Sequence, residues 1–376
     1  AMCTTCLSAK AGTSYPISGQ VDASLRVSGT RGNPQGSGFV QVSGGALAGE
    51  PFERLRANLD FSQGEVRARD IVLRKGAAAI SGQAEYLPAS RSFQFDLSGE
   101  RLPVEDIQRL RSRRLDLSGT ASFRLRGGGT VDRPVLNGTA RVANLAVNGE
   151  RVGGLSVQLQ TRDNELRAEL TSQFLRGRFG GNLAVSLGAD FPARGRIEFA
   201  DVDLDPLFTP ALRGRITTHS TATGWATVSG PLKKSEALEA KLEVTGFHVA
   251  LEKLDLRNRG PLLASYRNGT VQIEQAHLVG TDTDVSVTGA MKLSGPPSTR
   301  ALNVRADGRA DVALVRTLNP GLTGAGQVVL HLAAAGTLER PQVAGRAELR
   351  GASLALQEFP VSLSEMQGAL VFDTTR

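Results

Sequence analysis

Side chains able to do acid–base, nucleophilic or metal chemistry are sparse in this sequence. Cys3 and Cys6 form a single C-x-x-C pair. A structural zinc site takes four ligands, and neither a second cysteine pair nor a nearby histidine is present to complete one. We therefore expect neither a metal site nor a redox role for this pair.

The four histidines are scattered along the chain. None forms the i, i+4 helical pair or lies near a cysteine, as a metal site would require. They are His219, His248, His277 and His331. His331 stands between Leu330 and Leu332, so we predict an outward-facing strand residue at this position.

The acidic run DVDLD is the other candidate for metal binding. Asp201, Asp203 and Asp205 alternate with apolar residues, and the continuation of an EF-hand loop is missing, so a solvated strand edge is favoured over a calcium site. The sequence also lacks the G-x-S-x-G, P-loop and H-E-x-x-H motifs. We predict that the protein is not an enzyme and uses no metal or cofactor.

The formal net charge of +7 comes mostly from arginines dispersed one at a time among 37 acidic residues. Nucleic-acid binding needs a concentrated basic stripe or stacking aromatic residues, so a solvated face is favoured. The one compact basic run, Arg109–Arg114, could contact anionic lipid headgroups or cap a short helix. No stretch approaches the roughly 20 apolar residues that cross a bilayer, and residues 1–15 lack the plan of a signal peptide.

The same order of signals returns about every 100 residues. In each copy a glycine closes a strand-like segment, at Gly29, Gly127, Gly230 and Gly336. A turn followed by alternation recurs in QGEVRARDIVL, DNELRAEL and NGTVQIEQAHL. Each complete copy then ends on a pattern that predicts a short helical segment, in LPVEDIQRL, DLDPLF and DVALVRTL.

These signals predict an N-terminal tail, 1–16, followed by β repeats over 17–116, 117–221, 222–321 and a partial fourth repeat over 322–376. The fourth repeat stops midway. A repeat array normally ends on a capping unit, because a raw terminal strand exposes a pairing edge. We therefore expect the chain to be a fragment of a longer polypeptide.

Within the repeats, apolar and polar residues alternate strictly along each strand. A side-chain period of two with one apolar face predicts an antiparallel or solenoid-like sheet that is wet on one side. With strands every 8 to 12 residues, we expect roughly 35 short strands in one continuous curled sheet. The predicted fold class is therefore all-β, with short helical segments between the repeats.

Two interpretations of the apolar face remain open. The sheet could close on itself as a rigid solenoid with a dry core, or it could form an open trough that receives acyl chains. Each buried CH₂ contributes about 0.8 kcal/mol, so covering a 16-carbon chain would stabilise it by roughly 12 kcal/mol. The proposed lining residues are Leu155, Val157, Leu159, Leu183, Val185, Leu187, Val271, Ile273, Val285, Val287, Leu330 and Leu332.

Segments such as GGTVDRPVLNGTARVANLAV and GTLERPQVAGRAELRGASLAL follow the plan strand, G-T-x-x-x-P-x-h-x-G, strand. This plan resembles the repeats of the TamB family, the inner-membrane subunit of the translocation and assembly module, and of the wider AsmA-like group of envelope proteins. The likeness spans residues 17–376 through a degenerate repeat. It implies a β-taco, a long curled sheet with an apolar interior, in the periplasm of a diderm bacterium, where an N-terminal anchor absent from this sequence would hold it to the inner membrane.

Three functions follow as hypotheses. The first is an apolar groove that carries phospholipids between the inner and outer membranes. The second is a scaffold for the assembly of outer-membrane β-barrel proteins, beside an Omp85-type barrel that would be bound through regions outside this chain, and it would offer a sheet edge to nascent strands. The third is a surface solenoid that acts as an adhesin or stalk. None of them involves a nucleic acid.

Overall fold

The structure, a computed structural model, describes residues 17–30, 33–47, 49–108, 116–188, 190–206, 218–251, 254–314, 322–356 and 362–373. These residues form 22 strands of one antiparallel sheet, which confirms the all-β class. The strands are fewer than the roughly 35 that typical spacing predicts. That prediction was wrong because most strands are 10 to 16 residues long.

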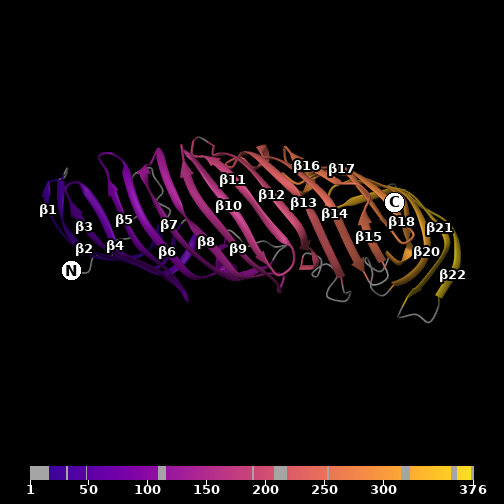
Figure 1. The fold of residues 1–376 in the computed structure, drawn as a ribbon, viewed down its shortest axis with the longest axis horizontal. Helices are drawn as coiled ribbons and strands as arrows, with labels where there is room; N and C mark the ends of the chain where they lie inside the picture. Colours follow the sequence, from indigo (N-terminus) through magenta and orange to yellow (C-terminus); the bar gives the residue numbers. More distant parts are fainter. Residues whose placement is uncertain are drawn as a thin grey trace. The chain divides into compact units, whose positions relative to one another are not determined.

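The chain divides into two compact units, Ala1–Leu175 with Asn182–Ala189, and Arg176–Gly181 with Asp190–Arg376. In the first unit, consecutive strands pair antiparallel and lie side by side in chain order (Figure 1). These strands are β1 (Ile17–Thr30), β2 (Asn33–Leu47), β3 (Glu50–Ser62), β4 (Glu65–Lys75), β5 (Ala78–Leu87), β6 (Ser92–Pro103), β7 (Leu117–Thr130), β8 (Arg133–Val147), β9 (Glu150–Arg162) and β10 (Glu165–Phe174). The division between the units falls within β11 (Arg178–Ser186).

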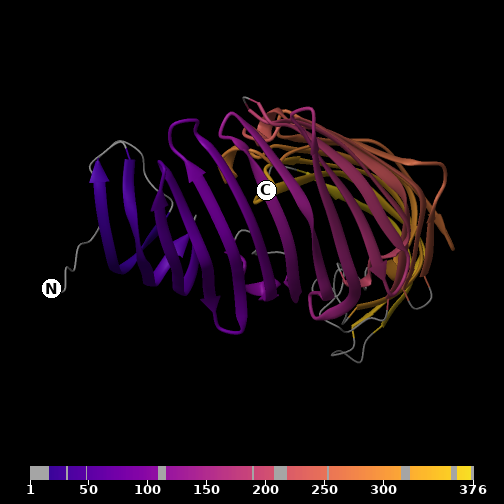
Figure 2. The same cartoon turned by 60° about the vertical axis from the view of Figure 1, so that its left-hand side comes forward.

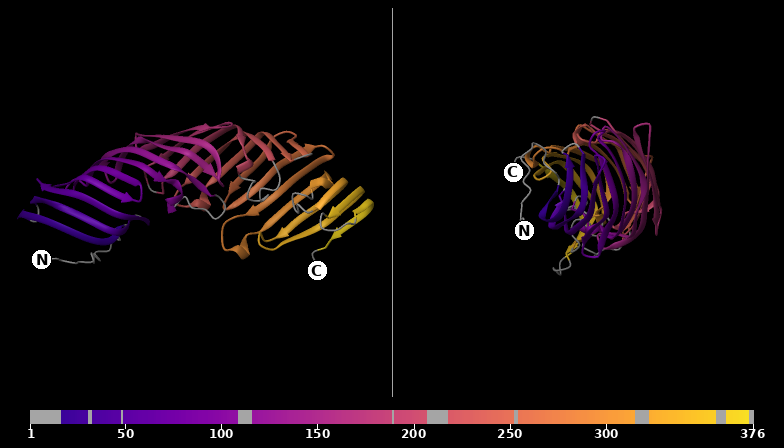
Figure 3. Two further views of the ribbon diagram at one scale, coloured as in Figure 1. Left: turned by 90° about the horizontal axis from the view of Figure 1, so that it is seen from below. Right: turned by 90° about the vertical axis from the view of Figure 1, so that its left-hand side faces the viewer.

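The second unit is built as the same kind of meander. Its strands bend along their length, so this part of the sheet is curved (Figures 2 and 3). They are β12 (Pro192–Asp203), β13 (Thr218–Pro231), β14 (Glu239–Leu251), β15 (Leu254–Asn258), β16 (Leu262–Arg267), β17 (Thr270–Gly280), β18 (Thr283–Lys292), β19 (Leu302–Asp311), β20 (Leu322–Gly336), β21 (Pro341–Leu356) and β22 (Ser362–Phe372). Both β15 and β16 pair with β14 and with β17, so together they occupy a single strand position that is interrupted between Asn258 and Leu262.

Because neighbouring strands run in opposite directions, their connections alternate between the two sides of the sheet at which the strands begin and end. We call these two sides edges, as distinct from the first and last strands. At one edge, which we call the turn edge, they are short and run from the two-residue β3–β4 turn to the nine-residue β18–β19 loop. The opposite edge, the crossover edge, carries the three longest connections, β6–β7, β12–β13 and β19–β20. The two edges of the apolar face therefore differ in how much chain is available to cover them.

The predicted helical segments all fall on the crossover edge. The described parts of these connections contain 3-10 turns at Val104–Asp106 and Val312–Leu314 and a helical pair, Asp205 and Pro206. Residues 109–115, 207–217 and 315–321 lie outside the described residues, so longer helical segments stay a prediction. Further 3-10 turns lie at the turn edge, over Ser235–Ala237 and Pro297–Thr299. Within the described part of the chain, no helix is long and apolar enough to cross a membrane.

Alternation in the sequence is reproduced in the burial of the strands. Along β7 and β8, half-buried and exposed residues alternate, with Phe123 and Leu125 covered and Arg124 and Arg126 exposed. Successive side chains of a strand point to opposite faces. The sheet therefore has one apolar face and one polar face.

The fully buried core is thin and is made of small side chains. Among the residues whose side chains are described, the buried apolar ones are seven alanines, six valines and Phe52, and no leucine or isoleucine is among them. In an ordinary globular core, leucine and isoleucine are among the residues most often fully buried. The large aliphatic side chains of this sheet therefore keep part of their surface uncovered.

Close approach between strands requires glycine at several positions of the apolar face. At Gly138 on β8, an added Cβ would overlap the carbonyl oxygen of Arg124 and lie 2.8 Å from Cδ2 of Leu125. Gly188 has no heavy atom within 4 Å of such a Cβ. The two glycines thus form a matched pair of crowded and open sites in the first unit.

We expect Gly138→Ala to destabilise the protein by about 1–3 kcal/mol, because the β7–β8 pair must separate to admit the methyl group. Gly188→Ala serves as the control and should leave stability unchanged or slightly raised. Urea unfolding followed by circular dichroism measures both. Equal unfolding midpoints for the two variants would contradict the close approach of β7 and β8 at Gly138.

Candidate functional site: the apolar face of the sheet

An unbroken row of apolar residues crosses all ten full strands of the first unit. Directly paired residues of neighbouring strands share a face, so the register alone defines this row. In order from β1 to β10, the first apolar row is Val21, Val42, Leu55, Leu73, Ile80, Gly99, Phe123, Ala140, Val157 and Leu170. No polar side chain interrupts it.

The second unit contains an equivalent row across nine strands. From β12 to β21, with β16 at the divided position, the second apolar row is Ile197, Ala226, Leu242, Ala264, Ile273, Gly289, Val304, Ala334 and Val343. It also lacks polar side chains. Each unit therefore presents a continuous apolar band that runs across its strands.

The sequence-predicted lining residues all lie in partly or fully covered positions. Val185 is buried, with 8% of its surface exposed, and the other eleven are half-buried. The register brings Val285 and Leu330 together on either side of Gly308, and it brings Val287 and Leu332 together on either side of Ala306. Leu183, Val185 and Leu187 lie on and just beyond β11.

The cross-strand partners of these residues are apolar almost throughout. Val157 pairs with Ala140 and Leu170, and Val271 pairs with Tyr266 and Met291. Among the lining residues outside β11 and its following turn, Leu155 is the exception, since it pairs with Val142 on one side and Ser172 on the other. The face is therefore suited to an apolar ligand and offers few groups for polar recognition.

Aromatic side chains lie flat on this face because glycines stand opposite them. The ring of Phe123 covers Gly99, and the ring of Phe95 covers Gly127, where an added Cβ would overlap each ring. Phe95 also stacks with Phe93, with ring centroids 6.2 Å apart and an interplanar angle of 9°. A ring that lies across the neighbouring strand projects less far from the sheet than a ring that stands perpendicular to it. These glycine–aromatic pairs therefore keep the apolar face flat.

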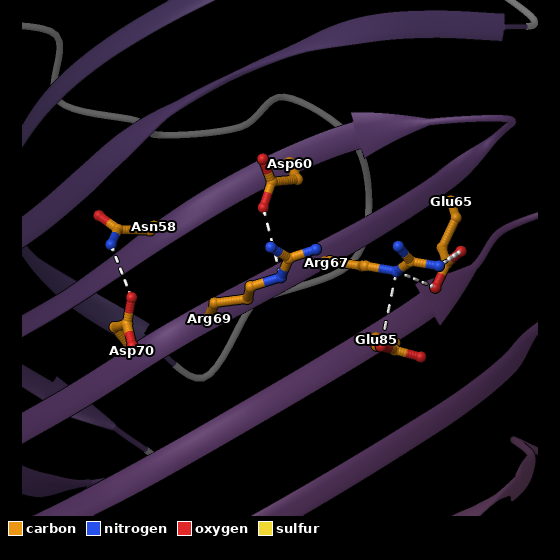
Figure 4. Close-up of polar contacts among 7 residues, drawn as sticks. All are labelled: Asn58, Asp60, Glu65, Arg67, Arg69, Asp70 and Glu85. Carbon is orange, nitrogen blue, oxygen red and sulfur yellow. Dashed lines mark hydrogen bonds and ion pairs between the residues drawn. The ribbon is translucent and has the colours of Figure 1, made fainter.

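The opposite face carries ion pairs both within and between strands. In the first unit, Arg67 contacts Glu65 at 2.8 Å and Glu85 at 3.5 Å, and Arg69 contacts Asp60 at 3.5 Å (Figure 4). The hydrogen bond to Glu65 raises the pKa of Arg67, so its guanidinium stays charged. Exposed pairs of this kind contribute little stability, but they keep this face solvated.

Open depressions in the described residues follow polar rows of this kind. One has a volume of about 520 Å³, and its lining includes the cross-strand row Ser98, Arg124, Thr139, Gln158 and Glu169. Another, of about 560 Å³, includes the row Gln83, Asp96, Arg126 and Asn137. Both rows consist of charged, amide and hydroxyl side chains of the polar face.

Each of the four histidines lies beside an aspartate, which sequence reasoning missed. Nitrogen–oxygen distances are 3.8 Å for His219–Asp205, 3.1 Å for His248–Asp255, 2.6 Å for His277–Asp284 and 3.0 Å for His331–Asp307. The i, i+7 spacing shared by the second and third pairs was the available signal. His331 is exposed, as its place between two leucines predicts.

The aspartates of DVDLD do not converge on one point. Asp203 accepts a hydrogen bond from the Asp205 backbone and contacts Arg176 at 3.4 Å. Asp205 is buried and accepts bonds from both the backbone N–H and the hydroxyl of Ser220, at 2.8 and 2.6 Å. The prediction of a solvated strand edge was wrong for Asp205, which instead satisfies polar groups where β12 ends.

The structure describes no group of side chains that could hold a metal ion. Cys3, Cys6 and the basic run Arg109–Arg114 lie outside the described residues. No protein-family model, no curated protein and no solved structure matches this chain.

The His277–Asp284 pair provides a test of the polar face at low pH. The hydrogen bond from His277 and, more weakly, the charge of Arg259 lower the pKa of Asp284 from its ordinary value of 3.8. A carboxyl group with a lowered folded pKa contributes stability above its unfolded pKa and loses it as the pH falls through the folded value. Asp284→Asn should therefore lower the melting temperature at pH 7, and this difference should shrink below about pH 3.8.

Melting temperatures between pH 7 and pH 2 measure this effect, with Asp282→Asn in the adjacent exposed turn as the control. A loss of stability in Asp284→Asn that stays constant down to pH 2 would show that the carboxylate charge does not act through this pair.

Proposed function

We propose that this chain is a lipid-carrying segment of an envelope protein similar to the TamB and AsmA-like group. In this proposal its sheet forms a β-taco in the periplasm, and phospholipid acyl chains lie along the apolar face as they move between the inner and outer membranes. The observation that carries the proposal is the unbroken apolar row in each unit, in a sheet where no leucine or isoleucine with a described side chain is fully buried.

Physical chemistry favours an apolar ligand at this face. Uncovered aliphatic surface costs about 25 cal/mol per Å², and the part of the chain that the structure describes supplies no second layer of strands within either unit to cover it. An acyl chain laid across the strands would remove this surface from water without any polar recognition. The shallow face formed by the glycine–aromatic pairs would accept chains of different length and saturation.

The repeat belongs to the same proposal. We infer units of six strand positions that correspond to residues 17–116, 117–221 and 222–321. In support, the long connections begin after Pro103, Asp203 and Asp311, so one follows every sixth strand position. The six-strand unit would allow the apolar face to be extended by adding further copies, since each copy contacts only its neighbours.

Substitutions on the two faces test lipid binding. The double variant Val157→Asp and Val285→Asp places one charge on the apolar face of each unit, and Gln158→Asp with Ser286→Asp places the same charges on the adjacent polar positions. We expect phospholipid to co-purify with the unsubstituted chain and with the polar-face variant and to be lost from the apolar-face variant, because a buried carboxylate beside an acyl chain is costly.

Native mass spectrometry with lipid extraction measures the bound lipid, and circular dichroism establishes that each variant is folded. Absence of lipid from the unsubstituted chain, or equal retention by both variants, would contradict the proposal.

A further inference from the structure

The two edges of the apolar face are built differently. On the crossover edge, Val104 and Val312 are buried, and Val312 packs against Gly324 of β20 where an added Cβ would lie 2.7 Å from its side chain. These residues hold the described starts of the β6–β7 and β19–β20 connections against the sheet. On the turn edge most connections are two to five residues long, so less chain is available there to cover the apolar face.

At the turn edge, neighbouring hairpins are joined by backbone hydrogen bonds that place an exposed apolar residue beside charged ones. In the first unit, Val131 donates to the carbonyl of Arg91 at 3.1 Å, and Arg91 contacts Asp132 at 3.5 Å. Val131 is half exposed. We call Arg91, Val131 and Asp132 the first rim cluster.

The second unit repeats this arrangement. Leu232 donates to the carbonyl of Phe191 at 3.1 Å, and Lys234 contacts the carboxylate of Asp190 at 3.1 Å. The ammonium of Lys233 lies 4.9 Å from the centre of the Phe191 ring. Asp190, Phe191, Leu232, Lys233 and Lys234 form the second rim cluster.

Tyrosines mark the same edge on the apolar side. Tyr86 pairs with Phe93 and Val66 near the β5–β6 turn, and Tyr266 pairs with Val271 next to the β16–β17 turn. Tyrosine has an apolar ring and a polar hydroxyl and is enriched where apolar and aqueous surroundings meet. The outermost apolar pairs on the turn edge therefore have the character of a boundary between acyl chain and water.

Single exposed apolar residues and single surface ion pairs are common and need no special explanation. Here the two features occur together in both units, at the same edge and next to an apolar face. Each cluster offers a cation and a carboxylate within 3.5 Å of one another. A ligand with a single charge would be attracted by one member of each cluster and repelled by the other. A ligand that carries both a positive and a negative charge would find a partner of opposite sign for each.

We propose that the rim clusters bind the headgroup of a zwitterionic phospholipid, one that carries a phosphate and an ammonium group. The phosphate lies against Arg91 or Lys234, the ammonium lies against Asp132 or Asp190, and the acyl chains pass over Val131 or Leu232 onto the apolar face. The turn edge is then the side from which lipids enter. This inference rests on the proposed function, because the headgroup is held only where acyl chains are bound.

Lipid uptake from vesicles tests the proposal. Vesicles of phosphatidylcholine containing equal small amounts of phosphatidylethanolamine, phosphatidylglycerol and diacylglycerol with identical acyl chains are incubated with the delipidated chain, and the lipids bound to the re-purified protein are quantified by mass spectrometry. We expect phosphatidylethanolamine to exceed diacylglycerol on the order of tenfold, as one charge-assisted hydrogen bond would produce, and also to exceed phosphatidylglycerol.

The variant Arg91→Glu with Lys234→Glu should lose this selectivity while still binding diacylglycerol. Arg141→Glu with Arg305→Glu makes the same charge change at exposed strand positions outside the rim clusters and should keep it. Inorganic phosphate at millimolar concentration should not compete, because without acyl chains it gains nothing from the apolar face.

Three outcomes separate the possibilities. Binding of no lipid at all by the unsubstituted chain would contradict the proposed function itself. Binding without headgroup preference, or a stronger preference for phosphatidylglycerol, would overturn the zwitterion site and leave the apolar face intact. Competition by inorganic phosphate, or equal loss of selectivity in both charge variants, would show that the rim clusters do not recognise a lipid headgroup.

Discussion

The structure depends on one constraint: the described residues form a single sheet, and within either unit they add no second layer of strands over its apolar face. Most domains bury the apolar side of a sheet against helices or another sheet. Here consecutive strands pair in a meander, so each further strand widens the same single sheet. The apolar face grows in proportion to the number of strands, and the short connections do not supply enough chain to cover it.

This constraint explains the composition of the core. Alanine and valine are buried because the strands themselves and their immediate neighbours are sufficient to cover small side chains. Leucine and isoleucine extend beyond that cover and remain partly exposed. Phe123 is laid across Gly99 by the same requirement, since a large side chain gains most contact when it lies along the sheet surface.

Several polar groups of the described residues have structural contacts. Asp205 binds both polar groups of Ser220 where a strand gives way to a long connection, so that a buried carboxylate has hydrogen-bond partners. The His–Asp pairs and the arginine ion pairs keep one face of a wide sheet charged. Charged side chains on an exposed sheet oppose unwanted association, which a protein with so many strands must avoid.

Much of this organisation is determined by the sequence alone. The period of two is sufficient to assign Leu155, Val157 and Leu159 to one face of β9, because neighbouring side chains of a strand must point to opposite faces. Charge excludes Arg124 and Arg126 from the apolar side in the same way. The number of strands was overestimated, since alternation identifies strands but a strand of 15 residues such as β8 carries no internal mark of its length.

Only the tertiary structure decided what depends on register and on contacts between distant residues. It aligned Val21 of β1 through to Leu170 of β10 in one row, and no local pattern specifies which residues of ten strands stand opposite one another. It also brought Arg91 beside Val131, and Asp190 beside Lys234, across neighbouring turns. Periodicity fixes the direction of a side chain through local sterics, whereas the pairing of strands sets its neighbours through the fold as a whole.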